Sequence, residues 1–313
     1  MERSDRVKII HNPADATVFA PDLDLAYDGH REPWQLPNGK KLAVSLLLHA
    51  PRYQDDVPSG AIKPLAMQGG VGRDTSEPRH GQVARLSQWD FGLTVGIWRL
   101  LDIARDAGMP TAVALDAEGV EAMPRLAADI ADRADEIVVR GRAANIIIGT
   151  GMSAEEEREY IVRARHAVES ASGRACVGWF GPERGQTAAT PALLRETGFR
   201  WFGDWPVDER PVILDGAASG LVAVSHQLEA EDMFSLYTRG LSFLEYERLL
   251  DDTVAQLLAD AELVGARHLG LSWFGWVLGQ AAFAGVAERF LRRLAAHPDI
   301  LLATPGDIAL LSR

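Results

Sequence analysis

The feature that most constrains this chain is a series of short apolar runs that recur along most of its length. In KLAVSLLLHA (41–50) and CVGWFG (176–181) the apolar residues are continuous rather than alternating with polar ones. Strands of this kind are buried on both faces, which is typical of a parallel sheet covered by helices. The other runs that we interpret as strands are 110–116, 136–141, 199–205, 221–226, 268–274 and 300–304.

Amphipathic stretches separate these runs, and several carry signals for helix starts. Two serines stand three residues before a glutamate, which is the spacing of a capping box, and Thr190-Pro191 predicts an N-cap followed by a proline. The predicted helices are 90–107, a stretch reaching about 133, 153–171 (after Ser153 and Glu156), 190–198, 242–264 (after Ser242 and Glu245) and 281–296. Alternating strands and helices, with one strand per about 30 residues, predict an α/β fold closed as a (β/α) barrel of about seven strands.

The domain organisation follows from the weakly patterned segments. We predict an N-terminal arm at 1–40 and a single barrel domain at 41–313. Residues 54–87 are rich in glycine, proline and charge. Because a connection longer than about 15 residues is uncommon in a compact domain, we predict that this segment is a lid or an interface arm.

Composition argues against several classes of partner. The net charge of −12 disfavours nucleic acid and anionic membranes, and no apolar run reaches the roughly 18 residues of a membrane span. The N-terminus lacks the apolar region of a secretory signal, and the single Cys176 cannot form an internal disulfide. We therefore expect a cytoplasmic protein that binds neither nucleic acid nor membrane.

In a (β/α) barrel the functional site lies at the carboxyl ends of the strands. The predicted strand ends carry a cationic and aromatic set of side chains. As catalytic candidates we take Asp204, His49 and His226, and as ligand-binding candidates Arg140, Arg142, Arg52, Asp116, Trp179, Phe180, Glu183, Asp204, Trp205, Trp273 and Phe274.

Metal and nucleophile motifs are not apparent. None of the eight histidines has another within three to five residues, and no cysteine pair is available, so we predict neither metal nor cofactor. His49 and His226 could converge with Asp204, but each could equally be a hydrogen-bonded histidine at a strand end. Ser225 and His226 are neighbours on a strand and face opposite ways, so they do not form a catalytic dyad.

The paired arginines are the most informative residues. If the strand geometry persists, Arg140 and Arg142 project to the same side and could bind a carboxylate or phosphate. The alternative is that they pair with local acids such as Asp116, Asp204 or Glu118 and only hold the fold.

Several stretches resemble the polysaccharide deacetylase superfamily, specifically the branch of metal-independent allantoinases and cyclic-imide hydrolases. The similarity covers roughly residues 33–310. It is carried by LPNGKKLAVSLLLHAPRY, WDFGLTVGIWRLLDIARDAGMPTAVALD, GMSAEEER, GWFGP, TPALLRETGFRWFGDWPVDERPV and LGQAAFAGVAERFLRRLAAHPDILLATPGDIA. The resemblance implies a distorted (β/α) barrel of about seven strands, a heritage of hydrolysing C–N bonds in N-acetyl sugars, cyclic ureides or imides, and commonly an oligomer.

The chain departs from this family at the functional positions. Ala50-Pro51-Arg52 replaces the acid that follows the first strand, and Arg140 and Ala144 stand at the positions of the H-x-x-x-H histidines. Phe180 replaces an arginine, and Trp273-Phe274-Gly275 replaces the late Leu-His-Pro motif. A permanent cation at Arg140 would repel a divalent ion, so the ancestral mechanism is not open to this chain.

Two hypotheses follow. The first is a metal-free, degenerate homologue that binds a small anionic or aromatic ligand or assembles with an active relative. The alternative is an active metal-independent amidohydrolase on a cyclic ureide, imide or N-acyl substrate, with a rebuilt site in which arginine polarises a carbonyl. We expect a homo-oligomer, with a hetero-oligomer containing an active homologue as the other option.

Overall fold

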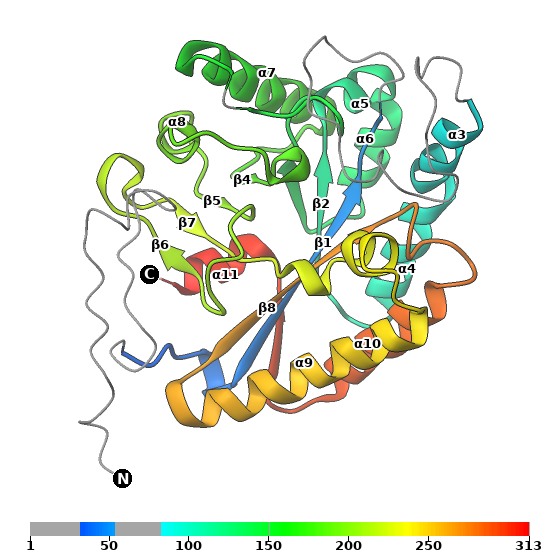
Figure 1. Ribbon diagram of the computed structural model, residues 1–313, viewed down its shortest axis with the longest axis vertical. Coiled ribbons are helices and arrows are strands. Elements are labelled where there is room, and N and C mark those ends of the chain that lie inside the picture. The colour runs from blue at the N-terminus through cyan, green and yellow to red at the C-terminus, as the bar shows by residue number, and fades with distance from the viewer. Residues whose placement is uncertain (1–31, 54–82, 150, 313) are drawn as a thin grey trace.

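The computed structural model describes residues 32–53, 83–149 and 151–312. Its centre is one sheet that curls into a partial barrel (Figure 1). The strand order is β6-β7-β5-β4-β3-β2-β1-β8, and β9 also pairs with β1. The strands are β1 Leu42–Ala50, β2 Thr111–Leu115, β3 Glu136–Val139, β4 Gly178–Trp179, β5 Trp201–Phe202, β6 Val212–Ile213, β7 Val222–Ala223, β8 Arg267–Phe274 and β9 Ile300–Ala303. The strand pairs are parallel except β6 with β7, so the predicted α/β barrel is confirmed.

Helices surround the sheet (Figure 1). They are α3 Val83–Phe91, α4 Ile97–Asp106, α5 Ala117–Ala122, α6 Pro124–Ala131, α7 Ala154–Ser172, α8 Thr190–Glu196, α9 Phe243–Val264, α10 Ala284–Ala296 and α11 Pro305–Leu311. Shorter turns are η3 Pro37–Gly39, η5 Pro182–Arg184, η6 Gly216–Ala218 and η7 Leu228–Ala230, with π-helical segments η4 Gly92–Gly96 and η8 Met233–Thr238.

The predicted helix starts are mostly confirmed. Both predicted capping boxes form, at the starts of α7 and α9. The N-cap prediction for Thr190 is wrong, because Ala189 is the N-cap of α8 and Thr190 is already helical. The Thr190 hydroxyl instead accepts the backbone N–H of Thr187 at 2.8 Å and donates to the buried carboxylate of Glu157.

The two faces of β1 pack into different apolar clusters. Leu42, Val44, Leu46 and Leu48 belong to the apolar core that includes the surrounding helices. The intervening residues face the interior of the barrel, where Ala43 and Leu47 join a second apolar cluster. The two polar ones are bonded to the neighbouring strand β8: Ser45 contacts His268 at 2.9 Å, and His49 contacts Ser272 at 2.7 Å. The interior therefore combines apolar packing with two bonded histidine–serine pairs.

Some elements differ from the sequence-based expectation. Residues 83–87, predicted to belong to the long loop, form the start of helix α3. The rest of that loop, 54–82, and residues 1–31 of the predicted arm lie outside the described residues. The strand β6 and the helix α11 were not predicted. Of the arm, 32–40 packs on the domain, since the Trp34 indole donates to the Leu311 carbonyl at 3.1 Å. In the described part of the chain, no helix combines the length and apolarity that crossing a membrane requires.

Candidate functional site

Five of the predicted site residues converge at the carboxyl end of the barrel interior. His49 is the last residue but one of β1, Arg140 follows β3, Phe180 follows β4, His226 follows β7 and Phe274 ends β8. All five are buried, with at most 2% of each residue exposed. The barrel mouth, by which we mean this group of five, is therefore filled by side chains.

A hydrogen-bonded chain runs through the barrel mouth from Arg140. The guanidinium Nε–H donates to His49 Nδ1 at 3.2 Å. Because arginine has no acceptor, His49 Nδ1 must accept, and the ring proton is on Nε2, which donates to Ser272 Oγ at 2.7 Å. Burial, and then the charge of Arg140, hold the pKa of His49 well below its usual range. His49 is therefore a neutral ring.

Among the residues that the structure describes, no carboxylate forms an ion pair with the Arg140 guanidinium. Its central carbon lies 5.6 Å from the ring centroid of Phe274, which stacks on His49 at 4.4 Å. Its Nη1 is buried and has no hydrogen-bond partner among the residues that the structure describes. Within the same residues, no ion pair involves Arg140. A buried cation with unused donors is unusual, since buried charges are normally paired.

The charge of Arg140 acts on the pKa of Asp116, but both carboxyl oxygens of Asp116 are hydrogen-bonded to other groups. Oδ1 accepts the Gly119 N–H and Oδ2 accepts the Arg52 N–H, both at 2.7 Å, so the carboxyl caps α5 and ties it to the segment after β1. Burial raises the pKa of Asp116 to about 7, against the opposing effects of these bonds and of Arg140. Near neutral pH it is thus only a partial counter-charge. Arg52 takes part through its backbone.

The prediction that Arg140 and Arg142 project together is wrong. The strand ends at Val139, and Gly141 has φ of +71°, which turns the chain between the two arginines. A side chain at Gly141 would also collide with Tyr160 and Pro182. Arg142 is partly exposed and pairs with Glu118 at 2.8 Å, although its Nε lacks a partner among the described residues. The local-acid alternative therefore describes Arg142 and not Arg140.

Three predicted aromatic residues lie outside the barrel rather than at its mouth. Trp179 packs on Phe199 with ring centroids 5.5 Å apart, and the Trp273 indole donates to the Tyr246 hydroxyl at 2.9 Å. Trp205 packs on Phe202 at 5.0 Å and donates to Gln186 at 2.8 Å. The reason is strand alternation: Phe180 and Phe274 take the inward direction, so the tryptophans before them must face outward.

Asp204 does not join the histidines. Its Oδ1 accepts the Gly181 N–H at 2.7 Å, and its Oδ2 accepts from the Gln186 amide. Burial raises its pKa to about 6. His49 and His226 both contact the ring of Phe180, with centroids 4.9 and 5.6 Å apart. The three catalytic candidates therefore do not form one group.

His226 is also a neutral ring with a fixed proton. Its Nδ1 lies 2.9 Å from the Val224 carbonyl oxygen, which can only accept, so the proton is on Nδ1. Burial is the main cause that holds the pKa of His226 well below its usual value. Its Nε2 is buried and has no partner in the described part of the chain.

The turn after β4 is strained and carries a second arginine. Glu183 and Arg184 have φ of 51° and 55°, which non-glycine residues adopt rarely. Arg184 lies over the Phe180 ring at 5.0 Å, pairs with Glu231 at 3.2 Å and donates to the His226 carbonyl at 2.8 Å. Its charge, unlike that of Arg140, has a carboxylate partner.

The sequence missed several residues around the barrel mouth. Asp232 accepts the backbone N–H groups of Phe274 and Leu278, which fixes the turn after β8. Tyr53 and Trp276 form a small cluster with Phe274. Asp232 lies in a segment without strand or helix periodicity, so no sequence pattern indicated its role.

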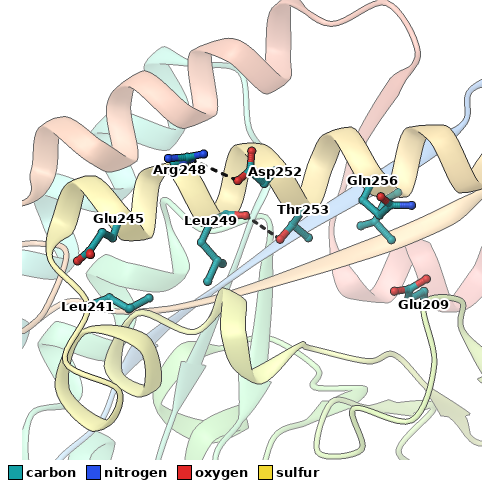
Figure 2. A pocket seen from close by; sticks show the side chains of 9 residues that line it. Glu209, Leu241, Glu245, Arg248, Leu249, Asp252, Thr253 and Gln256 are labelled. Carbon is teal, nitrogen blue, oxygen red and sulfur yellow. Dashed lines mark hydrogen bonds and ion pairs between the residues drawn. The ribbon is translucent and has the colours of Figure 1, made fainter.

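Two cavities at the surface lie away from the barrel mouth. One, of about 570 Å³, runs along α9 and is lined by Leu241, Leu249 and Leu257 with acidic neighbours (Figure 2). Another, of about 670 Å³, lies between α5 and α7. Among the described residues, no three histidine, cysteine or acidic side chains lie close enough together to hold a metal ion.

Comparisons with known proteins establish the fold. No family model matches the sequence, and no curated protein matches it. A Pseudomonas aeruginosa PAO1 structure described as a probable polysaccharide deacetylase matches with a TM-score of 0.80 and 21% identity, over 92% of this chain and 97% of that one. An allantoinase matches with a TM-score of 0.78 and 19% identity, over 92% and 96%. A Mycobacterium smegmatis protein named for the deacetylases has a TM-score of 0.73 and 20% identity, over 90% and 93%.

These similarities cover nearly the whole chain, but at sequence identities of 19–21% they establish the fold alone. The curled parallel sheet, its order and the surrounding helices agree with the distorted barrel that the sequence predicts. This chain therefore has the fold of the polysaccharide deacetylases, with Arg140, neutral histidines and phenylalanines at the barrel mouth.

Proposed function

We propose that this protein is a non-hydrolysing relative of the polysaccharide deacetylases that binds a small anion at the barrel mouth. One observation carries the proposal: the buried guanidinium of Arg140 has an unpartnered Nη1 and no carboxylate among the described residues. Leaving a charge buried and unpaired costs several kcal/mol, so an anion that supplies the missing acceptor would be bound with a large gain.

A hydrolytic metal centre does not fit these residues. If the resemblance to the polysaccharide deacetylases holds, Arg140 and Ala144 stand where that family has its metal-binding histidines. Ala144 is buried, and its backbone N–H donates to the Arg52 carbonyl at 2.9 Å. A divalent cation about 4 Å from the guanidinium would be repelled by roughly 8 kcal/mol at an effective dielectric near 20. We therefore derive no step through a metal.

The candidate bases are already engaged. His49 Nδ1 accepts from Arg140, and Asp116 and Asp204 accept backbone N–H groups. A general base must reach the proton that it abstracts, and these bonds already occupy an acceptor position on each of the three groups. This supports ligand binding over turnover.

The alternative, a metal-independent amidohydrolase, has one observation in its favour. The pKa of Asp204 is raised to about 6 and that of Asp116 to about 7, which is the range in which carboxyl groups exchange protons at neutral pH. Under this alternative Arg140 would polarise a carbonyl and Asp204 would act as the base.

Two measurements decide between these functions. Thermal unfolding with formate, acetate, phosphate and citrate should show an anion-dependent rise in Tm for the natural protein and for Arg142→Gln, but not for Arg140→Met. Allantoin, hydantoin, succinimide and N-acetylglucosamine oligomers should not be hydrolysed. Turnover that Arg140→Gln or Asp204→Asn abolishes would overturn the proposal, as would the absence of any anion effect.

Assembly is the other part of the proposal. Its support is the resemblance to the polysaccharide deacetylase superfamily, which implies an oligomer. We propose a homo-oligomer, and light scattering after size exclusion tests it. A monomer that stays monomeric when mixed with an active homologue would contradict assembly in either form.

A further inference from the structure

We propose that residues 6–10 of this chain, RVKII, dock in the groove along α9. This α9 groove is the surface cavity of about 570 Å³ described above, and it lies away from the barrel mouth. Residues 1–31 lie outside the described part of the chain. Three features point to this segment: the shape and charge of the groove, the place where the described chain begins, and the sequence of the segment itself.

The groove exposes one face of α9. Glu245, Leu249 and Asp252 line it in steps of four and three residues, so they share one helix face. Glu245 and Asp252 are exposed and Leu249 is half-buried, which leaves this face open to a binding segment. Leu241 and Glu209 lie off the helix, near opposite ends of the groove (Figure 2).

The groove is negatively charged. Its carboxylates are those of Glu209, Glu245 and Asp252, and Arg248 is the cation among the described lining residues. Arg248 lies 3.6 Å from Asp252, and Glu209 lies 3.6 Å from the buried Arg267. Two of the three carboxylates therefore already have a cation nearby, and the third does not.

The third carboxylate, Glu245, is ionised and available to a cation. It accepts the backbone N–H and the hydroxyl of Ser242 at 2.8 and 2.7 Å, and these bonds lower the pKa of Glu245. Ser242 is neutral, and Glu245 forms no ion pair with the residues that the structure describes. Because leucines supply the apolar part of the lining, the groove suits a segment that combines apolar and cationic side chains.

The described chain begins beside one end of the groove. The Glu32 carbonyl accepts the Arg210 Nη1–H at 2.9 Å, and Arg210 follows Glu209 in the chain. Just past α9, a Cβ at Gly265 would lie 2.7 Å from Pro33, so the chain runs close against this end of the helix (Figure 1). Residues 1–31 therefore join the described chain at the end of the groove where Glu209 lies.

The sequence RVKII matches the groove in charge and hydropathy. It contains two cations, three apolar residues and no acid. In an extended conformation Arg6 and Lys8 share one side, and Val7 and Ile9 share the other. The apolar side can then meet the leucines while the cations meet the carboxylates.

The lengths also agree. The helix face from Glu245 to Leu257 is about 18 Å long at 1.5 Å per residue, and five extended residues span about 17 Å. The connecting stretch 11–31 carries four aspartates and one arginine, so it suits the groove less well, and it reaches up to about 70 Å. A segment tethered in this way has an effective concentration on the order of millimolar, which favours the chain's own RVKII over that of a second copy or over a separate protein.

Disulfide formation tests this placement in the full-length protein. Ile9→Cys combined with Thr253→Cys, which lies midway along the groove, should cross-link within one chain under mild oxidation, while the native Cys176 is buried. Ile9→Cys combined with Val162→Cys is the matched control, because Val162 is 49% exposed on α7 and lines the other cavity. We expect the control pair to cross-link at least about 10-fold more slowly.

Charge reversal tests the complementarity. Arg6→Glu with Lys8→Glu should slow the cross-link of I9C with T253C about 5-fold, which is the effect of losing two exposed ion pairs. Adding Glu245→Lys should restore part of the rate. A rate that charge reversal leaves unchanged would overturn the assignment of the two cations to the groove.

The remaining outcomes each decide a point. A disulfide that joins two chains would overturn the choice of the chain's own segment in favour of that of a second copy. Equal rates for the two pairs, or no cross-link in either, would overturn docking in this groove and leave it to a separate protein. Thermal unfolding of each reduced variant verifies the fold. None of these results bears on anion binding at the barrel mouth, which thermal unfolding with anions tests separately.

Discussion

The two ends of β3 each carry a charged side chain, and they are compensated very differently. At the start of the strand, Glu136 accepts the Trp201 indole N–H at 2.8 Å and the Gly306 backbone N–H at 2.9 Å. Just past the end of the strand, the guanidinium of Arg140 donates at 3.2 Å to a neutral histidine and keeps an unpartnered Nη1 among the described residues. A compensated charge holds elements together, whereas an uncompensated one is available for a ligand.

The largest effect should come from the compensated end. Glu136→Ala would leave the Trp201 and Gly306 donors without an acceptor, and each unsatisfied buried donor costs about 1–3 kcal/mol. We expect the free energy of unfolding to fall by about 4 kcal/mol in urea denaturation, with Glu136→Gln losing less because it keeps one acceptor. The acetate response should survive in both variants. If Glu136→Ala removed that response without unfolding the protein, the two ends of β3 would not be independent.

The ionisation of Asp116 determines how much negative charge lies near Arg140, so the pH dependence of stability tests whether Arg140 is compensated. Its folded-state pKa of about 7 lies above the ordinary 3.8, because burial disfavours the charged form. Its contribution to stability is therefore fully present below about pH 4 and is lost as the pH rises through 7. Each pH unit in this window changes that contribution by about 1.4 kcal/mol, so the total is on the order of 4 kcal/mol.

Asp116→Asn measures this contribution directly. The difference in unfolding free energy between the natural protein and the variant should shrink as the pH rises from 4 to 7, measured in urea at each pH. A difference that stays constant over this range would mean that Asp116 is ionised throughout. Arg140 would then have a full counter-charge, which would remove the main argument for an anion.

Arg140→Met tests the uncompensated end in the absence of ligand. Replacing a poorly compensated buried charge with a side chain of similar volume is often neutral or stabilising. We expect a gain of about 1 kcal/mol in anion-free buffer, and a loss relative to the natural protein when acetate is saturating. Arg140→Lys, which keeps the charge, should show no such gain. A loss above about 2 kcal/mol without anion would show that the guanidinium is structural.

The sequence anticipates the architecture better than the barrel mouth, for physical reasons. Continuous apolar runs identify β1 and β8 because a covered parallel strand has no polar face. The same continuity hides which side chains point inward, so the choice between Trp273 and Phe274 could not be read from the run itself. Arg140 and Arg142 point apart because the backbone of Gly141 is in the left-handed region, and a glycine in the sequence does not by itself predict that conformation. Tyr53 and Trp276 are brought to the barrel mouth by tertiary packing, which leaves no local signal.

The smallest effect should come from Arg142, the paired arginine two residues beyond Arg140. Its ion pair with Glu118, at 2.8 Å, joins side chains that are 30% and 19% exposed, and partly exposed pairs contribute little. A double-mutant cycle with Arg142→Ala and Glu118→Ala should give a coupling energy of about 0.5 kcal/mol in urea denaturation, with acetate binding unchanged. A coupling energy above 2 kcal/mol would mean that the ion pair with Glu118 is a major structural contact. If Arg142→Ala lowered the affinity for acetate, both arginines would bind the ligand. A carboxylate partner would then not distinguish a structural arginine from a ligand-binding one.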